Sequence, residues 1–439
     1  MHYTILGGGP AGLFSAVILA EAGHTCVVLE RNAVVGGCHR VDRVGLDGRF
    51  SEHGPRVYMS NYLRYKRILR AIGLRFDDCY VPYAHSFPVG LASALQHMSV
   101  GEAVRLAGSY LRFMMQPRRY ARMPVSELLR GFSSEARGYF DKICKLTDGA
   151  GIRRYTAGSL FELVNQGIFY ELREPCAPSD EFLWPACMAR LANLGVDIRT
   201  NAIARSLVLS PDKKRVGAIT LESGESVSVP GRLVLAVPPA AVRALFAASS
   251  PAVRDAFMPW AEFVRYSIAT DYITYIPFTL HWNRHLQLPR VWGNGFGDWG
   301  VVWIVMSDYF PGDATLLSCA IVELDAVSRA TGRSANATES DGDLIGEATR
   351  QVMRALTDAA GEASMSLPAP DAAVLSPAVC RVGGRWTTAD TAYIRTPDSV
   401  RFPFEAPNLA DLYSVGCHNE KHEFAFTSIE AVTDNVFQF

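Results

Sequence analysis

The sequence predicts an α/β protein in which a nucleotide-binding parallel sheet is interrupted by a second, α+β part. Residues 2–29 read as strand, glycine-rich turn, helix and strand. Short apolar strands of the same kind recur at residues 233–237 and 411–415, far from the first pair. With 439 residues, the chain is long enough for two or three domains, and we expect the separated strands to meet in one sheet.

The composition is that of a globular protein with a large core, and it excludes a disordered chain, a fibre and a coiled coil. Apolar residues make up 49% of the chain, and the formal net charge is −1, so no overall field attracts nucleic acid. None of the nine cysteines forms a CxxC pair, so we expect no metal site, no disulfide framework and a reducing compartment. We find no apolar run of 18 residues and no basic segment before the first strand. These features predict a cytoplasmic protein without a spanning helix or a signal peptide.

The first thirty residues carry the clearest motif. A strand at residues 2–6 leads into residues 7–12 (GGGPAG), which form a G-x-G-x-x-G turn. Residues 13–22 read as a helix, and the strand at 26–29 ends at Glu30. The glycines permit a tight turn and close approach of the backbone to a pyrophosphate at the helix N-terminus. Glu30 stands where it can accept a hydrogen bond from a ribose hydroxyl.

Residues 30–37 (ERNAVVGG) extend this unit, and the E-R-x4-G-G pattern resembles the flavoprotein superfamily of amine oxidases and carotenoid desaturases. In that family the second glycine pair brings backbone amides onto the FAD pyrophosphate. The arginine that often follows is Cys38 here, and Arg40 is the candidate to replace it. Residues 51–56 (SEHGPR) are similar to the family's turn against the flavin ring.

Three later segments resemble the same family. Residues 196–209 read as a pair of strands near the adenine, and residues 233–241 (LVLAVPPAA) are similar to the third FAD-domain segment. Residues 411–416 read as a strand ending in glycine, and 427–432 open a helix aimed at the flavin pyrimidine. The family's acidic residue after that glycine is replaced by Cys417, which also raises covalent flavin attachment as a less favoured alternative.

The resemblance implies a discontinuous Rossmann-like FAD-binding domain made of residues 1–75, 195–250 and 376–439. Residues 76–194 and 251–375 are then expected to form an inserted substrate domain, built on a mixed sheet plus helices. The residues implied to contact FAD are Gly7, Gly9, Pro10, Ala11, Gly12, Glu30, Arg31, Gly36, Gly37, Arg40, Gly54, Pro55, Arg56, Ile203, Val237, Gly416, Cys417, Ser428 and Ile429.

Aromatic residues concentrate in the second half of the predicted substrate domain. Residues 301–305 form an apolar strand, alternation over 266–278 suggests another, and 344–360 read as an amphipathic helix. Such strands would floor a cavity over the flavin; the alternative is a sheet packed on its own core. The aromatic candidates are Trp260, Tyr266, Tyr272, Tyr275, Trp282, Trp292, Trp299, Trp303, Tyr309 and Phe310.

The positions of the lysines argue against one of the reactions that the resemblance implies, amine oxidation. Flavin amine oxidases generally place a substrate-domain lysine beside flavin N5, but this sequence has no lysine between Lys214 and Lys421. Galactopyranose mutases, in the same superfamily, have histidines where Arg56 and Met59 stand. The desaturase branch fits better, because Glu52 begins an E-x-G…Y…L…G run like the one seen there.

The sequence therefore predicts a FAD-dependent oxidoreductase that removes a hydride from a small, apolar organic substrate. The alternatives are a flavin amine oxidase, a FAD-dependent isomerase or mutase, and a non-catalytic FAD-binding homologue; an NAD-only dehydrogenase is least favoured. Asp390 and Glu423 are candidate bases. Candidates for the flavin-facing pocket are His53, Arg56, Tyr58 and Trp386.

Residues 103–126 form an arginine-rich, acid-free stretch in which apolar residues crowd a predicted helix ending near Pro117. A basic amphipathic helix of this kind can dock on an anionic lipid surface. The alternative is a solvated helix that covers the substrate domain. The sequence leaves both open, and it does not predict an oligomeric state.

Overall fold

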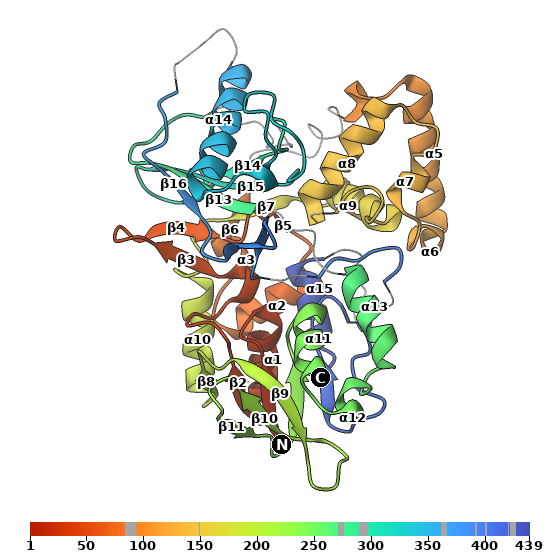
Figure 1. Ribbon diagram of the computed structural model, residues 1–439, viewed down its shortest axis with the longest axis vertical. Helices are drawn as coiled ribbons and strands as arrows, with labels where there is room; N and C mark the ends of the chain where they lie inside the picture. Colours follow the sequence, from red (N-terminus) through yellow and green to blue (C-terminus); the bar gives the residue numbers. More distant parts are fainter. Residues whose placement is uncertain are drawn as a thin grey trace.

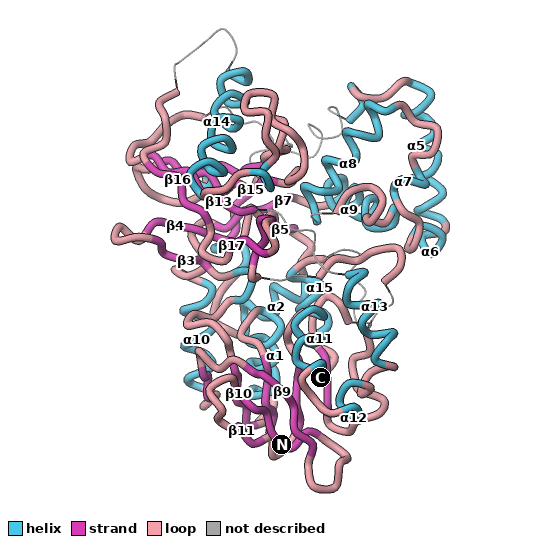
Figure 2. Tube along the Cα trace, viewed as in Figure 1, coloured by secondary structure: helices cyan, strands magenta, loops and turns pink. Residues whose placement is uncertain are grey.

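The computed structural model describes residues 1–83, 94–148, 150–270, 276–288, 297–360, 367–390, 393–399, 402–419, 421 and 427–439. The two chain termini lie in one part of the molecule, around the parallel sheet (Figure 1). Two lobes lie at the opposite end, one built on an antiparallel sheet and one made of helices (Figures 1 and 2). The predicted α/β class with an inserted α+β part is confirmed.

The parallel sheet joins segments from the start, the middle and the end of the chain. Ile5 pairs with Val28 on one side and Val234 on the other, and Leu235 pairs with Ser414. Its strands are apolar because helices and a second sheet cover both faces. The strand order is β19 (Leu412–Ser414), β12 (Arg232–Leu235), β1 (His2–Leu6), β2 (Thr25–Leu29), β8 (Asp197–Arg199).

One face of this sheet is covered by helices that share one core. The first of them is almost entirely buried, because it is apolar all round. These helices are α1 (Pro10–Glu21), α2 (Leu63–Ala71), α10 (Leu183–Asn193) and α15 (Ile429–Val436).

The other face carries an antiparallel meander and three helices. The two strands expected over 196–209 are present, but they join different sheets: the first lies in the parallel sheet, and the second starts the meander. The elements are β9 (Ala204–Leu209), β10 (Val216–Leu221), β11 (Ser226–Ser228), α11 (Pro239–Ala247), α12 (Pro251–Arg254) and α13 (Trp260–Thr270).

The strand expected over 266–278 is wrong in its first part, because helix α13 (Trp260–Thr270) occupies it. Phe263, Tyr266, Ser267 and Thr270 are its buried residues, and the spacing i, i+3, i+4, i+7 is that of a helical stripe. The strand begins only at Ile276, while Tyr272 and Tyr275 lie outside the described residues.

The upper sheet is antiparallel in every described pairing, rather than mixed as expected. The amphipathic helix predicted at 344–360 is confirmed as α14 (Asp341–Ala360), whose apolar side packs on this sheet. The strand order is β14 (Val302–Val305), β15 (Thr315–Ile321), β13 (Ile276–Trp282), β16 (Ala372–Leu375).

Smaller elements connect the two parts of the molecule. A hairpin and a three-stranded sheet lie between the parallel sheet and the upper sheet (Figure 1). The hairpin consists of β3 (Val41–Val44) and β4 (Arg49–Glu52), and the three-stranded sheet of β5 (Tyr58–Met59), β7 (Leu172–Pro175) and β6 (Tyr80–Pro82). A second hairpin is formed by β17 (Val379–Val382) and β18 (Arg385–Thr388). The remaining short helices are α3 (Phe76–Cys79), η1 (Gly37–His39), η2 (Met306–Asp308) and η3 (Ala335–Ala337).

The helical lobe has its own core and begins with a capped helix. Ser99 and Glu102 form a capping box, and the helix ends at Met115, just before Pro117 as predicted. The helices are α5 (Val100–Met115), α6 (Pro117–Tyr120), α7 (Val125–Leu128), α8 (Ser134–Asp148) and α9 (Ala157–Phe169). Among the described residues, no helix is both long and apolar enough to cross a membrane.

Packing does not follow the predicted domain limits everywhere. Helix α10 lies in the stretch assigned to the substrate domain but packs on α1. Helix α13, from the same domain, packs on α11. Conversely, Trp386 of β18 lies in the core of the upper sheet. The division at residues 75, 194, 250 and 375 stays a prediction.

Candidate functional site

A cavity of about 950 Å³ runs from the glycine-rich turn into the helical lobe. At one end Gly7 and Glu30 line it, at the other Leu106 of α5 and Phe140 of α8. Trp303 of β14 contributes to its wall from the upper sheet. The cavity therefore connects the nucleotide-binding turn to both lobes.

Two glycine loops lie against each other at the nucleotide end. A Cβ atom on Gly37 would stand 2.9 Å from the Cα of Gly9, and Gly37 has a φ of +54°. A Cβ atom on Gly12 would stand 1.9 Å from the carbonyl oxygen of Gly7. Side chains at these positions would separate the loops, so the glycines make a cradle of backbone.

The N-terminus of α1 opens into this cradle. Gly9 is its N-cap residue and supplies no side-chain cap, and Pro10 occupies the first turn. Gly9, Pro10 and Ala11 all line the cavity. The first-turn amides and the positive end of the helix dipole suit an anionic group such as a pyrophosphate.

Glu30 is 5% exposed and holds the glycine-rich turn. One carboxylate oxygen accepts a hydrogen bond from the Gly8 amide at 2.6 Å, and the other accepts one from the Asn32 amide at 2.8 Å. Each carboxylate oxygen has a second acceptor site, and Glu30 faces the cavity. The residue can therefore also bind a ribose hydroxyl.

Arg40 is 8% exposed and belongs to an ion-pair network beside the cavity. It donates to Asp42 at 2.9 Å and to Asp390 at 3.0 Å, and these hydrogen bonds raise its pKa although burial opposes its charge. Its Nη1 atom is buried without a hydrogen-bond partner. A buried orphan donor of a cation fits an anionic ligand. The role of Arg40 in place of the family's arginine stays a prediction.

Asp390, a candidate base, is paired with two arginines. It accepts hydrogen bonds from Arg31 at 3.1 Å and from Arg40. The other candidate base, Glu423, lies outside the described residues.

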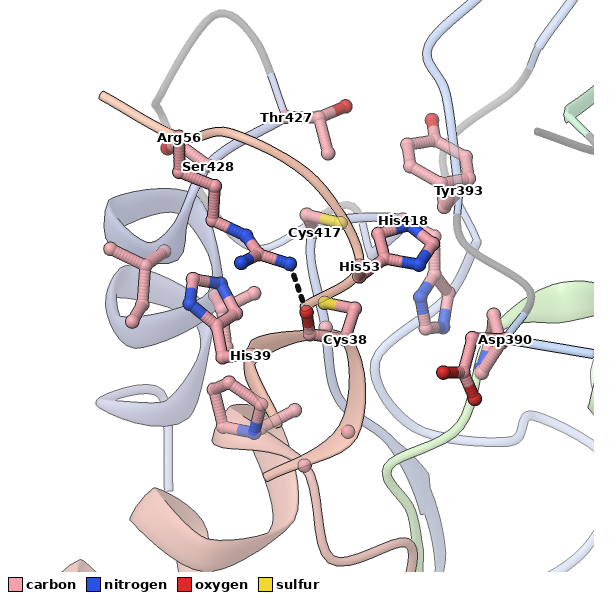
Figure 3. A pocket seen from close by; sticks show the side chains of 18 of the residues that line it. Cys38, His39, His53, Arg56, Asp390, Tyr393, Cys417, His418, Thr427 and Ser428 are labelled. Atoms are coloured by element: carbon pink, nitrogen blue, oxygen red, sulfur yellow. Dashed lines mark hydrogen bonds between the residues drawn. The ribbon is translucent and has the colours of Figure 1, made fainter. Parts of the chain in front are cut away.

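The turn around Gly54 brings a neutral histidine and a paired arginine to the cavity. Burial lowers the pKa of His53 to about 3, with Arg56 and Arg40 adding to the effect. Arg56 donates a hydrogen bond to the carbonyl of Cys38 (Figure 3) and pairs with Glu52 at 3.5 Å. Burial also raises the pKa of the Cys38 thiol, so this thiol stays protonated at neutral pH.

The C-terminal segment closes the opposite wall. Gly416 donates its amide to the Asn435 side chain at 2.8 Å, and Cys417 lines the cavity next to it. Ser428 caps α15 by accepting a hydrogen bond from the Ala431 amide at 3.1 Å. Figure 3 shows Ser428, Thr427 and Cys417 around the Arg56 side chain.

Most of the predicted contact residues come together in this one cavity. Gly12, Gly36, Gly54 and Arg40 are not among its lining residues, although Arg40 is bonded to Asp390, which is. Those that line it are Gly7, Gly9, Pro10, Ala11, Glu30, Arg31, Gly37, His53, Pro55, Arg56, Tyr58, Ile203, Val237, Gly416, Cys417, Ser428 and Ile429.

Trp386, predicted for the flavin-facing pocket, is not brought to the cavity. It is 4% exposed, and its indole donates to the Thr338 hydroxyl at 2.9 Å. The strand β18 directs this ring into the core under α14 rather than toward the nucleotide end. Of the described aromatic candidates in the second half of the chain, only Trp303 lines the cavity; Trp292 lies outside the described residues.

The apolar extension into the helical lobe was not predicted. No local motif marks it, because its residues read as ordinary helix-core positions; only their later convergence makes a cavity. They are Leu106, Tyr139, Phe140, Ile143, Thr147, Tyr155, Leu160, Leu163 and Val164. We call this set the apolar arm.

Comparison with known proteins supports the nucleotide-binding end. Residues 5–72 match the model of the NAD(P)-binding Rossmann-like domain. L-amino acid oxidase Lm29 of Lachesis muta is 34% identical over 77 residues, which are 18% of this chain and 15% of the oxidase. A 4,4'-diapophytoene desaturase of Staphylococcus haemolyticus is 35% identical over 92 residues, which are 20% of this chain and 18% of the desaturase. The chain thus spans less than a fifth of either relative in these matches.

Solved structures match over the whole chain. A putrescine oxidase with bound putrescine superposes with a TM-score of 0.67 at 14% identity, covering 100% of this chain and 98% of that one. An oxidoreductase of Methanosarcina mazei does so with a TM-score of 0.59 at 12% identity, covering 100% and 99%. At these identities the likeness to the solved structures shows the fold alone, and the sequence similarity to amino acid oxidases and desaturases covers about a fifth of this chain.

Proposed function

We propose that this protein is a FAD-dependent oxidoreductase that removes a hydride from an apolar organic substrate. The observation that carries the proposal is the single cavity joining the glycine cradle to the apolar arm. The adenine end of FAD would lie near Ile203 and the ribose at Glu30. The pyrophosphate would lie at the N-terminus of α1, and the orphan Nη1 atom of Arg40 is a candidate to donate a hydrogen bond to it.

Bound FAD supplies a hydride acceptor at N5. The chain's own residues bind the cofactor, orient the substrate and exclude water. The N-terminus of α15, capped by Ser428, would stabilise negative charge on the pyrimidine side of the ring. His53, neutral because it is buried, adds no positive charge to the turn beside the ring.

The charge distribution in the cavity favours an apolar substrate over an amine. Its acidic lining residues are Glu30, Glu222 and Asp390, all grouped with the nucleotide end. Within the described part of the apolar arm, no carboxylate is available to hold an ammonium group. The flavin amine oxidase, the flavin isomerase and the non-catalytic homologue remain the alternatives to this reading.

The first experiment is to purify the protein and test it for flavin. We expect yellow protein, or colourless protein that takes up added FAD at one per chain. Anaerobic bleaching of the flavin by apolar, allylic or saturated compounds supports an oxidoreductase; bleaching only by amines supports an amine oxidase. Protein that neither contains nor binds FAD overturns the proposal.

The outer face of α5 supports peripheral contact with an anionic membrane. Val100, Val104, Leu111 and Met115 are all more than 60% exposed and lie at helical spacing on one side. Residues 103–126 contain no acidic residue, and their arginines are Arg105, Arg112, Arg118, Arg119 and Arg122. Because Leu106 of the same helix lines the apolar arm, an apolar compound leaving a bilayer at α5 would have a short path to the cavity.

Co-sedimentation with vesicles tests this contact. We expect binding to vesicles containing phosphatidylglycerol, weaker binding to pure phosphatidylcholine, and loss of binding at high salt. The pair Leu111→Asp and Met115→Asp should abolish binding. Leu46→Asp, at a fully exposed leucine of the β3–β4 turn, is the matched control and should bind normally. Equal binding by both variants would contradict the contact.

A further inference from the structure

A buried carboxyl group stands behind the cavity wall with no partner. Glu174 of β7 is 0% exposed, and neither of its carboxylate oxygens has a hydrogen-bond partner. A lone ionised carboxylate in such a place would cost several kcal/mol. The group must therefore be neutralised by a proton or by a neighbouring charge.

The strand register places Glu174 beside the Arg56 turn. Tyr58 pairs with Arg173 and Met59 with Leu172, so Val57 extends the antiparallel register opposite Glu174. Leu172, two residues before Glu174 on the same face of β7, lines the cavity. Glu174 thus lies close behind the wall that Arg56 and Tyr58 form.

A second carboxyl group shares the same cation. Glu52 pairs with Arg56 at 3.5 Å through one oxygen, and its other oxygen is buried without a partner. Glu52 disfavours the charged form of Glu174, and Arg56 favours it. Two carboxyl groups therefore act on each other beside one guanidinium; both oxygens of Glu174 lack a donor, whereas the Ser318 hydroxyl and Arg56 favour the charged form of Glu52.

Among the described residues, Arg56 is the cation that acts on both Glu52 and Glu174, whereas Arg40 acts on the neighbouring His53. Tyr58 on β5 and Tyr83 after β6 both feel the Glu174 charge, and burial raises the pKa of each phenol. Burial likewise raises the pKa of both Glu52 and Glu174. His53, next to Glu52, is neutral at neutral pH because burial lowers its pKa to about 3.

We propose that Glu52 and Glu174 share one proton at neutral pH and that Glu174 thereby acts as a positioning residue for Arg56. With one proton bound, two carboxyl groups and one guanidinium sum to zero charge. Arg56 then stays on Glu52 and the Cys38 carbonyl, and the cavity wall beside it is neutral. This last step rests on the proposed function, because a neutral wall suits an apolar substrate.

Infrared difference spectroscopy of the holoprotein tests the shared proton directly. At pH 7 the wild type should show the C=O stretch of a buried protonated carboxyl group. The band should vanish in both Glu174→Gln and Glu52→Gln, because the remaining carboxylate then pairs with Arg56. Absence of the band in the wild type overturns the proposal, and so does its survival in either variant.

The pH dependence of unfolding gives a second readout. A carboxyl group with a raised folded pKa contributes stability below its unfolded pKa and loses it as pH rises through the folded pKa. The unfolding equilibrium constant of the wild type should therefore rise by up to about tenfold per pH unit relative to that of Glu174→Gln. Glu171→Gln, an exposed neighbour paired with Arg173, is the control and should follow the wild type.

Parallel pH curves for the wild type and Glu174→Gln would overturn the proposal. If Glu174→Gln does not fold, the wild-type and Glu52→Gln spectra still decide. Failure of the proposed function is distinguishable, because FAD uptake is scored by flavin absorbance and the shared proton by the carboxyl band.

Binding of two small probes tests the neutral wall. Glu52→Gln with Glu174→Gln removes the two carboxyl groups that neutralise Arg56 in this cluster, so benzoate should bind the double variant at least about tenfold more tightly than the wild type. Neutral benzyl alcohol should bind both proteins alike. Unchanged benzoate binding would overturn the role assigned to the pair.

Discussion

Glu30 holds the glycine-rich turn and lines the cavity with one carboxylate. Its two hydrogen bonds to the amides of Gly8 and Asn32 fix the turn on both sides of the strand end. The same group faces the cavity where a ribose would lie. A single residue therefore links the geometry of the turn to ligand recognition.

Replacing Glu30 by Gln should weaken both roles. The amide keeps the shape but loses the charge and one acceptor, so one backbone amide is left without its bond. We expect FAD affinity to fall about 10- to 100-fold, because a hydrogen bond to a charged group contributes about 1.5–3 kcal/mol. Quenching of flavin fluorescence on titration measures it. Glu21→Gln, which breaks only an exposed pair with Arg190, should bind FAD like the wild type.

For single residues, the sequence predicts a structural role where that role depends only on neighbours in the same turn or loop. The positions of Gly9, Gly37 and Glu30 could be predicted because each acts on backbone within one turn or one loop. Trp386 could not be placed, since the direction of its ring depends on how β18 packs under α14. Glu174 was not singled out, because nothing within β7 shows that Glu52 and Arg56 lie behind it.

The contact between the two glycine loops can be tested with a matched pair of substitutions. Gly37→Ala adds a methyl group 2.9 Å from the Gly9 Cα atom at a φ of +54°. Gly45→Ala, in the β3–β4 turn at a φ of +72°, meets nothing within 4 Å. Both should lose roughly 1 kcal/mol of stability from backbone strain. Only Gly37→Ala should also lose FAD affinity, by more than about tenfold, because only there do the loops separate.

Chemical denaturation and FAD titration of both variants give the result. Equal FAD affinity for Gly37→Ala and Gly45→Ala would show that the close approach of the loops does not form the cofactor site.

The N-terminal caps of α15 and α5 also form a matched pair, because Ser428 lines the cavity and Ser99 lies outside it. Ser428→Ala removes the cap of α15 at the cavity, and Ser99→Ala removes the cap of α5, outside it. Each should reduce the free energy of unfolding by about 1 kcal/mol. The Ser428 variant should in addition lower the flavin reduction potential, because the helix end stabilises the reduced, anionic ring. A potential that is unchanged in Ser428→Ala contradicts this placement of the ring.

The elements themselves follow local pattern closely where it is long and periodic. α1, α5 and α14 could be predicted because each has a cap, a proline or an amphipathic stripe. The strand expected over 266–278 failed because aromatic alternation also fits a helical stripe, and packing on α11 selected the helix. Both strands expected over 196–209 form, but the sheet that each one joins could not be predicted, because pairing partners are set by distant strands.

At the scale of the whole molecule, the parallel sheet joins distant parts of the chain, and the cavity lies where separately packed parts meet. Strands from residues 2–6, 232–235 and 412–414 are adjacent in one sheet, so the nucleotide end cannot form without both chain ends. The apolar arm is lined by a different lobe, with its own core. The cavity is thus the place where separately packed parts meet.

Because residues from each of those parts line the cavity, a bound cofactor should stabilise the whole molecule rather than one lobe. A ligand that binds only the folded state adds RT ln(1 + [L]/Kd), about 2.7 kcal/mol at a free concentration of 100 times Kd. We therefore expect FAD to raise the unfolding temperature measured by near-UV circular dichroism, which reports the aromatic cores of both the parallel sheet and the upper sheet. ADP, which can fill only the nucleotide end, should give a smaller rise. A FAD effect no larger than that of ADP at the same free concentration would mean that the flavin ring adds no binding energy, and it would place the ring outside the cavity.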